Sequence, residues 1–245
     1  MVREIRGILR TALNRALKWG LVSRNVAALT DAPRAEAKDV TVLTPDQARS
    51  LLEAARGNRL EALFTVALAL GLRRGEALGI RWQDIDVDAG TLQVRQQLQR
   101  IGGKLELVEP KTRKARRTVA LPSIAVAALR AHRARQNAER LALGEAWVDS
   151  GLVFTSEIGT PLDPDNLKRS WYALRERAKL KTLRFHDLRH ACATLLLAQG
   201  VHPRVVMETL GHSQIGVTMN VYSHVLPMLQ REAADALDAA LAVGQ

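Results

Sequence analysis

Apolar residues recur at helical spacing over most of the chain, so the sequence predicts a mainly helical protein. Between residues 4 and 19 they form one stripe that ends at Gly20. Thr44 followed by Pro45 is a helix start, with Thr as N-cap and Pro at the first helical position. The same reasoning predicts helices at about 45–56, 60–70, 76–79, 123–143, 164–178, 185–199, 203–210 and 227–242.

From residue 91 the hydrophobic period changes to two. Apolar and polar residues then alternate in three short runs, which contain Leu92, Val94 and Leu98, then Leu105 and Leu107, and then Val119 and Leu121. Alternation of this kind is typical of strands with one buried face. We therefore predict an α+β fold, mainly helical, with a small antiparallel sheet of three strands.

The first helix and the main body are separated by a polar segment. Residues 34–39 have no periodic apolar face and are interpreted as a linker. One helix cannot bury its apolar stripe alone, so we expect earlier helices of the same domain to be absent from this sequence. We divide the chain into residues 1–38, the end of a helical domain with its linker, and residues 39–245, the main domain.

The charge of the chain indicates a polyanionic partner. Its 245 residues carry a formal net charge of +11 at pH 7. Most of the cations are arginines, whose planar guanidinium groups bind phosphate oxygens in pairs, and we infer a nucleic-acid ligand.

Cysteine content and the N-terminus exclude other classes. Cys192 is the single cysteine, so neither an internal disulfide nor a cysteine-based zinc site is expected. The first residues lack the apolar region of a secretory signal, and no run of eighteen apolar residues occurs. We expect a cytoplasmic protein that acts on DNA without contact with a membrane.

Two tyrosines are available for chemistry. Tyr172 lies beside Trp171 in an amphipathic helix, which favours a half-buried packing role. Tyr222 instead follows a turn rich in glycine and histidine, among polar residues.

A histidine and an arginine precede this tyrosine on one predicted helix. His186 and Arg189 are three residues apart and share a face, while Leu188, Cys192 and Leu195 form a face suited to the core. Taken alone, the pair favours a solvated helix face over a site.

Three motifs in sequence order change that interpretation. They are Gly71-Leu72-Arg73-Arg74-Gly75-Glu76 with residues 80–86, then Glu109-Pro110-Lys111-Thr112 with residues 116–122, and then His186-Asp187-Leu188-Arg189-His190 with Leu210-Gly211-His212 and Tyr222. Together they span about residues 40 to 225. The set resembles the catalytic domain of tyrosine site-specific DNA recombinases, the phage integrase family. By the same resemblance, residues 1–38 are a remnant of that family's core-binding domain.

The resemblance implies a role for each matching residue. Two arginines, Arg73 and Arg189, clamp the scissile phosphate, and Tyr222 attacks its phosphorus. Glu76 is a structural partner of the site rather than a catalyst.

The remaining roles concern proton transfer. By the same resemblance Lys111 protonates the leaving 5′ oxygen, and His186 and His212 assist proton transfer and hydrogen-bond the phosphate. Lys111 competes for this role with the neighbouring cations Arg113, Lys114 and Arg116, which could instead contact DNA phosphates. Arg74 is assigned to the surface or to the DNA backbone.

Physical chemistry agrees with these implied roles. Phosphoryl transfer gathers negative charge on nonbridging oxygens, which fixed cations stabilise. Tyrosine has a pKa near 10, so its phenol needs a base or a cationic environment to become a nucleophile. A phosphotyrosine intermediate keeps the energy of the broken diester, so we predict no cofactor and no metal, and the sequence has no phosphate-binding P-loop.

Other sites fit the sequence less well. His186 and His190 have the spacing of a zinc pair, but Asp187 stands where metalloproteases have Glu. Asp84, Asp86 and Asp88 alternate like a calcium loop whose glycine and closing glutamate are missing, so they are expected to end a helix and begin the sheet. Packing roles are expected for Trp82, Trp147 and Trp171, and surface positions for His132 and His202.

The resemblance implies a function and partners. The leading hypothesis is integration or excision of a mobile element through a 3′-phosphotyrosine intermediate on double-stranded DNA. The alternatives are a non-cleaving DNA-binding remnant or accessory protein, and DNA relaxation like that of a type IB topoisomerase. A homotetramer on paired sites is expected to exchange the amphipathic helix at 227–242, which could instead dock on its own domain. Accessory DNA-bending proteins are further possible partners.

Overall fold

The computed structural model describes residues 2–32, 43–110, 116–211 and 241. The chain divides into two compact units, residues 1–39 and 40–245, and each is described by itself. The assignment of residues 1–38 to a core-binding domain stays a prediction. No helix among the described residues is long and apolar enough to cross a membrane.

The first unit contains α1 (Val2–Lys18) and α2 (Val26–Leu29). No residue of α1 is buried, although the helix is amphipathic as predicted. Asn25 joins the two helices. Its Nδ2 donates hydrogen bonds to the Arg10 carbonyl (2.9 Å) and to Asn14 Oδ1 (2.7 Å), while its Oδ1 accepts from Ala28 N (3.1 Å) and caps α2.

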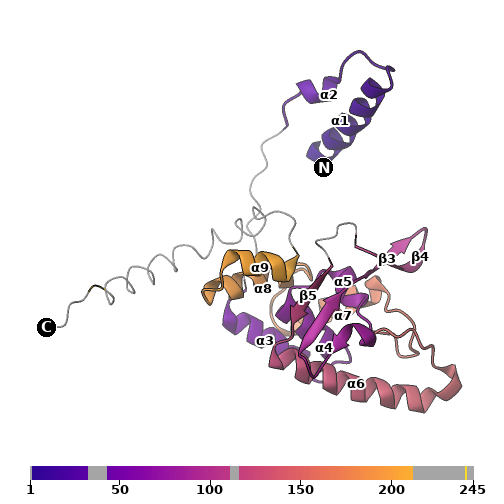
Figure 1. Cartoon of the computed structure of the whole chain (residues 1–245), viewed down its shortest axis with the longest axis vertical. Coiled ribbons are helices and arrows are strands. Elements are labelled where there is room, and N and C mark those ends of the chain that lie inside the picture. The colour runs from indigo at the N-terminus through magenta and orange to yellow at the C-terminus, as the bar shows by residue number, and fades with distance from the viewer. Residues whose placement is uncertain (1, 33–42, 111–115, 212–240, 242–245) are drawn as a thin grey trace. The chain divides into compact units, whose positions relative to one another are not determined.

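The second unit is built around α4, whose residues are mostly buried. Figure 1 shows this unit as a group of helices with a small sheet, and α4 packs against α3, α5, α6 and α8. The helices are α3 (Pro45–Ala55), α4 (Glu61–Leu70), α5 (Arg74–Leu78), α6 (Ser123–Leu143), α7 (Pro164–Arg177), α8 (Asp187–Ala198) and α9 (Pro203–Leu210), with 3-10 turns η1 (Trp82–Asp84) and η3 (Gly144–Ala146). The predicted helices in the described range are therefore confirmed.

The sheet is three-stranded, as predicted, but its members differ. Strands β1 (Ile85–Asp86), β2 (Thr91–Val94) and β5 (Arg117–Ala120) pair antiparallel in the order β1-β2-β5. The predicted strand around residue 105 belongs instead to a separate hairpin of β3 (Gln97–Ile101) and β4 (Lys104–Val108). This hairpin packs against α5 and projects from the body of the unit (Figure 1).

Two glycines explain why the hairpin leaves the sheet. A side chain on Gly75 would lie 2.9 Å from the Leu98 carbonyl, and one on Gly79 would lie 2.9 Å from Gln97 Cα. Between β2 and β3, Gln96 Nε2 donates to the Gly79 carbonyl (2.9 Å). The close approach to α5 therefore redirects the chain after Val94.

A buried polar network on α6 corrects the expectation for His132, which was placed on the surface. His132 is 2% exposed, because Ala125, Leu129, His132 and Gln136 form the buried stripe of this helix. His132 Nε2 lies 2.7 Å from the Val153 carbonyl, which requires a proton on Nε2. Its Nδ1 accepts from Arg135 (2.9 Å), so the ring is neutral in this arrangement.

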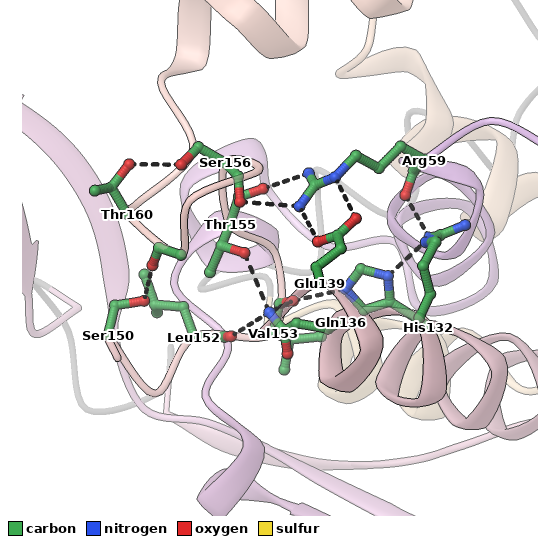
Figure 2. Close-up of polar contacts among 12 residues, drawn as sticks. Arg59, His132, Gln136, Glu139, Ser150, Leu152, Val153, Thr155, Ser156 and Thr160 are labelled. Atoms are coloured by element: carbon green, nitrogen blue, oxygen red, sulfur yellow. Dashed lines mark hydrogen bonds and ion pairs between the residues drawn. The ribbon is translucent and has the colours of Figure 1, made fainter. Parts of the chain in front are cut away.

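The same network holds the loop before α7 (Figure 2). Gln136 Nε2 donates to the carbonyls of Leu152 (3.2 Å) and Val153 (3.1 Å). Arg59 forms a bidentate ion pair with Glu139 (2.9 and 2.7 Å) and donates to the Thr155 carbonyl (2.7 Å). Residues 59, 132–139 and 152–156 therefore form one hydrogen-bonded group.

The aromatic residues largely follow prediction. Trp171 is buried, and Trp82 packs on α6 with its Nε1 donating to Gln136 (2.6 Å). Tyr172 is 42% exposed, which agrees with the expected half-buried packing role. Its ring is covered by the guanidinium of Arg175, 4.3 Å from the ring centre, on the outer face of α7.

Candidate functional site

The structure describes four of the seven residues that the motifs single out. Arg73, Glu76, His186 and Arg189 come from the beginnings of α5 and α8. Lys111, His212 and Tyr222 lie outside the described residues, as does the predicted helix at 227–242 apart from residue 241.

Arg73 and Glu76 are joined at the start of α5. Arg73 is the N-cap residue of this short helix, and Glu76 is at the third helical position. Glu76 accepts from the Arg73 backbone N–H (3.1 Å) and from the Arg73 guanidinium (2.6 Å). The local fold therefore fixes the direction of the Arg73 side chain, which remains 38% exposed.

Glu76 binds a second arginine from the sheet. The guanidinium of Arg117, at the start of β5, donates to both Glu76 carboxylate oxygens at 3.0 and 3.4 Å. Burial alone raises the pKa of Glu76, but the charges and hydrogen bonds of Arg117 and Arg73 outweigh it and hold the pKa below its ordinary value. The buried carboxylate is therefore ionised, and the expected role of Glu76 as a structural partner of the site stays a prediction.

Arg189 lies inside the unit, in the first turn of α8. It is 2% exposed and donates to the carbonyls of Gly71 (2.8 Å) and Leu210 (2.5 Å). Burial, followed by the charge of Arg73, lowers the pKa of Arg189 to about 9. This value is above neutral pH, so the guanidinium stays charged.

These contacts converge on the C-terminal end of α9. Three consecutive carbonyls there accept hydrogen bonds from three arginines: Thr209 from Arg117 (2.7 Å), Leu210 from Arg189 (2.5 Å) and Gly211 from Arg73 (3.3 Å). The last carbonyls of a helix have no partners within it and form the negative end of its dipole, so cations stabilise them. The backbone at residues 209–211 is therefore held by three arginines.

Two glycines make this convergence possible. Gly71 and Gly211 end α4 and α9 in the left-handed conformation, with φ of 59° and 68°. A side chain on Gly71 would lie 2.2 Å from Leu210, and one on Gly211 would lie 2.9 Å from Arg117 Nη1. Both positions need glycine for their conformation and for the close approach.

His186 differs from Arg189 in its surroundings. The helix begins at Asp187 rather than at the predicted residue 185, so His186 is the exposed residue just before α8. Loss of water around the ring, followed by the charges of His190 and Arg189, lowers the pKa of His186 below its ordinary value. The imidazole is therefore neutral at pH 7 and available to accept a proton.

Basic side chains also line two clefts beside this site. A cleft of about 740 Å³ contains Arg81, Arg95, Arg116 and Arg117, and another of about 400 Å³ contains His186 with Arg74, Arg175 and Arg184. Arg74 is exposed, as predicted. Among the residues that the structure describes, no group of three or more His, Cys, Asp or Glu is placed to hold a metal ion.

Sequence reasoning missed the part played by Arg117. The residue was noted within the hairpin motif but was given no role. Strand alternation could have identified it, because Arg117 is two residues before the buried Val119 and lies on the same face of β5. A charged side chain on the buried face of a strand requires a buried partner.

Comparison with known proteins identifies relatives of the whole chain. The model of the phage integrase family matches residues 41–228. A tyrosine recombinase XerC-like protein of Caldanaerobacter subterraneus subsp. tengcongensis is 32% identical over 97% of this chain, and an integrase of Saccharopolyspora erythraea is 30% identical over 96%. The chain spans 65% of the length of each of these two relatives.

Solved structures share the fold. The Tn1549 transposon integrase in complex with transposon right end DNA has a TM-score of 0.77 at 23% identity, covering 98% of this chain and 79% of that one. The XerA recombinase has a TM-score of 0.63 at 25% identity, covering 89% of this chain and 69% of that one. The predicted fold class is thereby confirmed.

Proposed function

Because the chain belongs to the phage integrase family, we propose that it is the catalytic part of a site-specific recombinase that cuts and rejoins DNA. The observation that carries this proposal is the convergence of Arg73, Arg117 and Arg189 on the end of α9. Four charged side chains lie close together there, three arginines and Glu76. Such a cluster of guanidinium groups suits a phosphodiester, whose negative charge grows in the transition state.

Arg73 and Arg189 bind the scissile phosphate in this proposal. Arg73 is half-exposed beside its carboxylate partner and is directed by the cap of α5, so its remaining N–H groups meet a nonbridging oxygen. Arg189 adds charge from within the unit. Both guanidinium groups stay protonated through the reaction, and no metal is required.

Tyr222 supplies the nucleophile. Its phenol oxygen forms a bond to phosphorus, the bond from phosphorus to the 5′ oxygen breaks, and the phenol proton passes to a base. Lys111 gives a proton to the leaving 5′ oxygen. His186, whose pKa is lowered, and His212 exchange protons and hydrogen bonds with the phosphate. Attack by the 5′ hydroxyl of another strand reverses the step and restores the diester.

We extend the proposal to the domain organisation, partners and location of the enzyme. Residues 1–38 are the end of a core-binding domain, and the catalytic domain follows. The partner is double-stranded DNA in the cytoplasm, bound by a homotetramer that exchanges its C-terminal helix, with accessory DNA-bending proteins. The +11 charge supports DNA as the ligand. Integration or excision of a mobile element is the outcome.

Capture of the covalent intermediate tests the proposal. The protein is incubated with nicked duplexes that contain a random-sequence region, and DNA linked to protein is recovered and sequenced. We expect adducts with a shared sequence from the wild type and none from Tyr222→Phe. Tyr172→Phe is the matched control, because it removes the chain's other tyrosine hydroxyl, and it should keep the adduct.

Each other outcome has a clear meaning. An adduct that survives Tyr222→Phe overturns the assignment of the nucleophile. Tight DNA binding without any adduct favours a non-cleaving accessory protein. Relaxation of supercoiled DNA without products from paired sites favours a topoisomerase-like activity.

A further inference from the structure

Arg117 is the residue around which the described part of the site is assembled. It is the first residue of β5, and its side chain is 7% exposed. Its contacts reach residues 41 and 92 positions away in the sequence, Glu76 on α5 and Thr209 at the end of α9. One guanidinium group therefore connects the sheet, the helix of the first arginine motif, and the helix that precedes the nucleophile segment.

The contacts of Arg117 determine where α9 ends. Its Nε donates to the Thr209 carbonyl at 2.7 Å. Gly211 packs on the same guanidinium so closely that a Cβ there would lie 2.9 Å from Nη1 and 3.1 Å from Cδ. The guanidinium is planar and holds α9 both by a hydrogen bond and by packing. It therefore fixes the position of α9 along the helix axis and its rotation about that axis.

The same contacts determine the direction of Arg73. Glu76 is shared between Arg73 and Arg117, so Arg117 holds the carboxylate against which Arg73 is aligned. We propose that Arg117 is a positioning residue for strand cleavage, holding both the arginine of the first motif and the end of α9 without contacting the substrate. This inference rests on the proposed function.

A purely structural ion pair would behave differently, and the chain offers a matched control. Arg59 also forms a bidentate ion pair with a glutamate and donates to a backbone carbonyl, but it does so in the network of Figure 2. Arg59→Met and Arg117→Met both remove such an arginine. Each variant loses an ion pair, and Arg117→Met should lose more stability because its pair is more deeply buried. Only Arg117→Met should affect cleavage.

The first measurement is the rate of adduct formation on pre-bound DNA of the recovered sequence, well below the unfolding temperature. We expect Arg117→Met to lower this rate about 10²-fold, because displacement of reacting groups by about 1 Å has effects of that size. The dissociation constant for DNA should change less than about threefold. Arg117→Lys, which keeps the charge and one donor, should recover part of the rate. Arg59→Met should keep the wild-type rate.

A second substrate distinguishes an effect of Arg117 on α9 from an effect on Lys111 in the neighbouring segment. Arg117 is six positions after Lys111, so its loss could instead misplace the predicted acid. A DNA with sulfur at the 5′ bridging position leaves as a thiolate and does not need that acid. A defect that persists on this substrate supports positioning through Arg73 and α9, whereas recovery of the rate overturns it.

Amide hydrogen exchange tests the inference without any DNA. In Arg117→Met, exchange at residues 203–211 should become faster, while exchange at 152–156 should stay as in the wild type. Arg59→Met should give the reverse pattern. Unchanged exchange at 203–211 overturns the inference. If the wild type forms no adduct on any DNA, the proposed function fails, and this measurement still decides whether Arg117 positions α9.

Discussion

Two groups of arginines hold backbone carbonyls in this protein, and they differ in charge and burial. In the first, Arg73, Arg117 and Arg189 surround Glu76, whose side chain is 3% exposed. In the second, Arg59 pairs with Glu139, and both side chains are 23% exposed (Figure 2). Removing one member of a buried ion pair is costly, while a partly exposed pair is nearly neutral in its effect.

The difference agrees with the ligand site that we propose for the first group. Three guanidinium groups around one buried carboxylate suit the phosphate of the proposed substrate. The Arg59 group has its acceptors within the protein and connects α6 to the loop before α7. We expect it to stabilise the fold.

The largest difference should come from Arg73→Ala. Removing a guanidinium that stabilises charge in phosphoryl transfer costs about 10³ to 10⁵ in rate. We expect that loss in the rate of adduct formation. Arg74→Ala is the control, because Arg74 is adjacent and exposed, and it should weaken DNA binding while changing the rate on bound DNA less than about tenfold. Equal rate losses in the two variants would remove Arg73 from the phosphate site.

Replacing Glu76 and Glu139 in turn compares how much each group contributes to the free energy of unfolding. Glu76→Gln leaves buried guanidinium groups without their counter-charge, so the free energy of unfolding should fall by about 3–5 kcal/mol. Glu139→Gln should lower it by about 1 kcal/mol or less, because that pair is partly exposed. Denaturant unfolding measures both. Similar losses would show that burial does not distinguish the groups.

Alanine substitutions at two glycines distinguish the cost of backbone strain from the cost of a clash with Arg117. Gly211 and Gly200 both adopt positive φ, 68° and 74°, but only Gly211 has a neighbour within reach of an added Cβ. Gly200→Ala should cost about 1–2 kcal/mol from the left-handed conformation alone. Gly211→Ala should cost about 1 kcal/mol more and should slow adduct formation. An effect on stability without one on rate would contradict the importance of the end of α9.

Local signals in the sequence predicted the helices well. Pro203 and Gly211 bracket α9, and Thr44 with Gln47 forms the capping box of α3, so these helix ends depend on residues close in sequence. Membership of the sheet was predicted less well. The expectation that Asp84 and Asp86 end a helix and begin the sheet is confirmed by η1 and β1. Ile85 and Asp86 are too few to show alternation, however, and their pairing with β2 depends on tertiary contacts.

The roles of the site residues stay predictions. The structure places Arg73, Glu76 and Arg189 close together, while Lys111, His212 and Tyr222 lie outside the described residues. Arg117 was missed because its partners are far away in sequence. His132 was misplaced although it continues the buried stripe of Leu129, because its partner, the Val153 carbonyl, gives no signal in the sequence.

The smallest expected effect concerns His132 of the second group, which should make the free energy of unfolding depend on pH. Burial, together with the charges of Arg135 and Arg59, lowers its pKa below the ordinary 6.5, although the Val153 hydrogen bond and Glu139 oppose this. The unfolded chain therefore binds more protons than the folded one as pH falls below about 6.5, and stability falls with it, by at most about 1.4 kcal/mol per pH unit. Denaturant unfolding at pH 5 to 8 measures this slope. His132→Gln should reduce it, and an unchanged slope would assign it to His186 and His190, whose pKa values are also lowered.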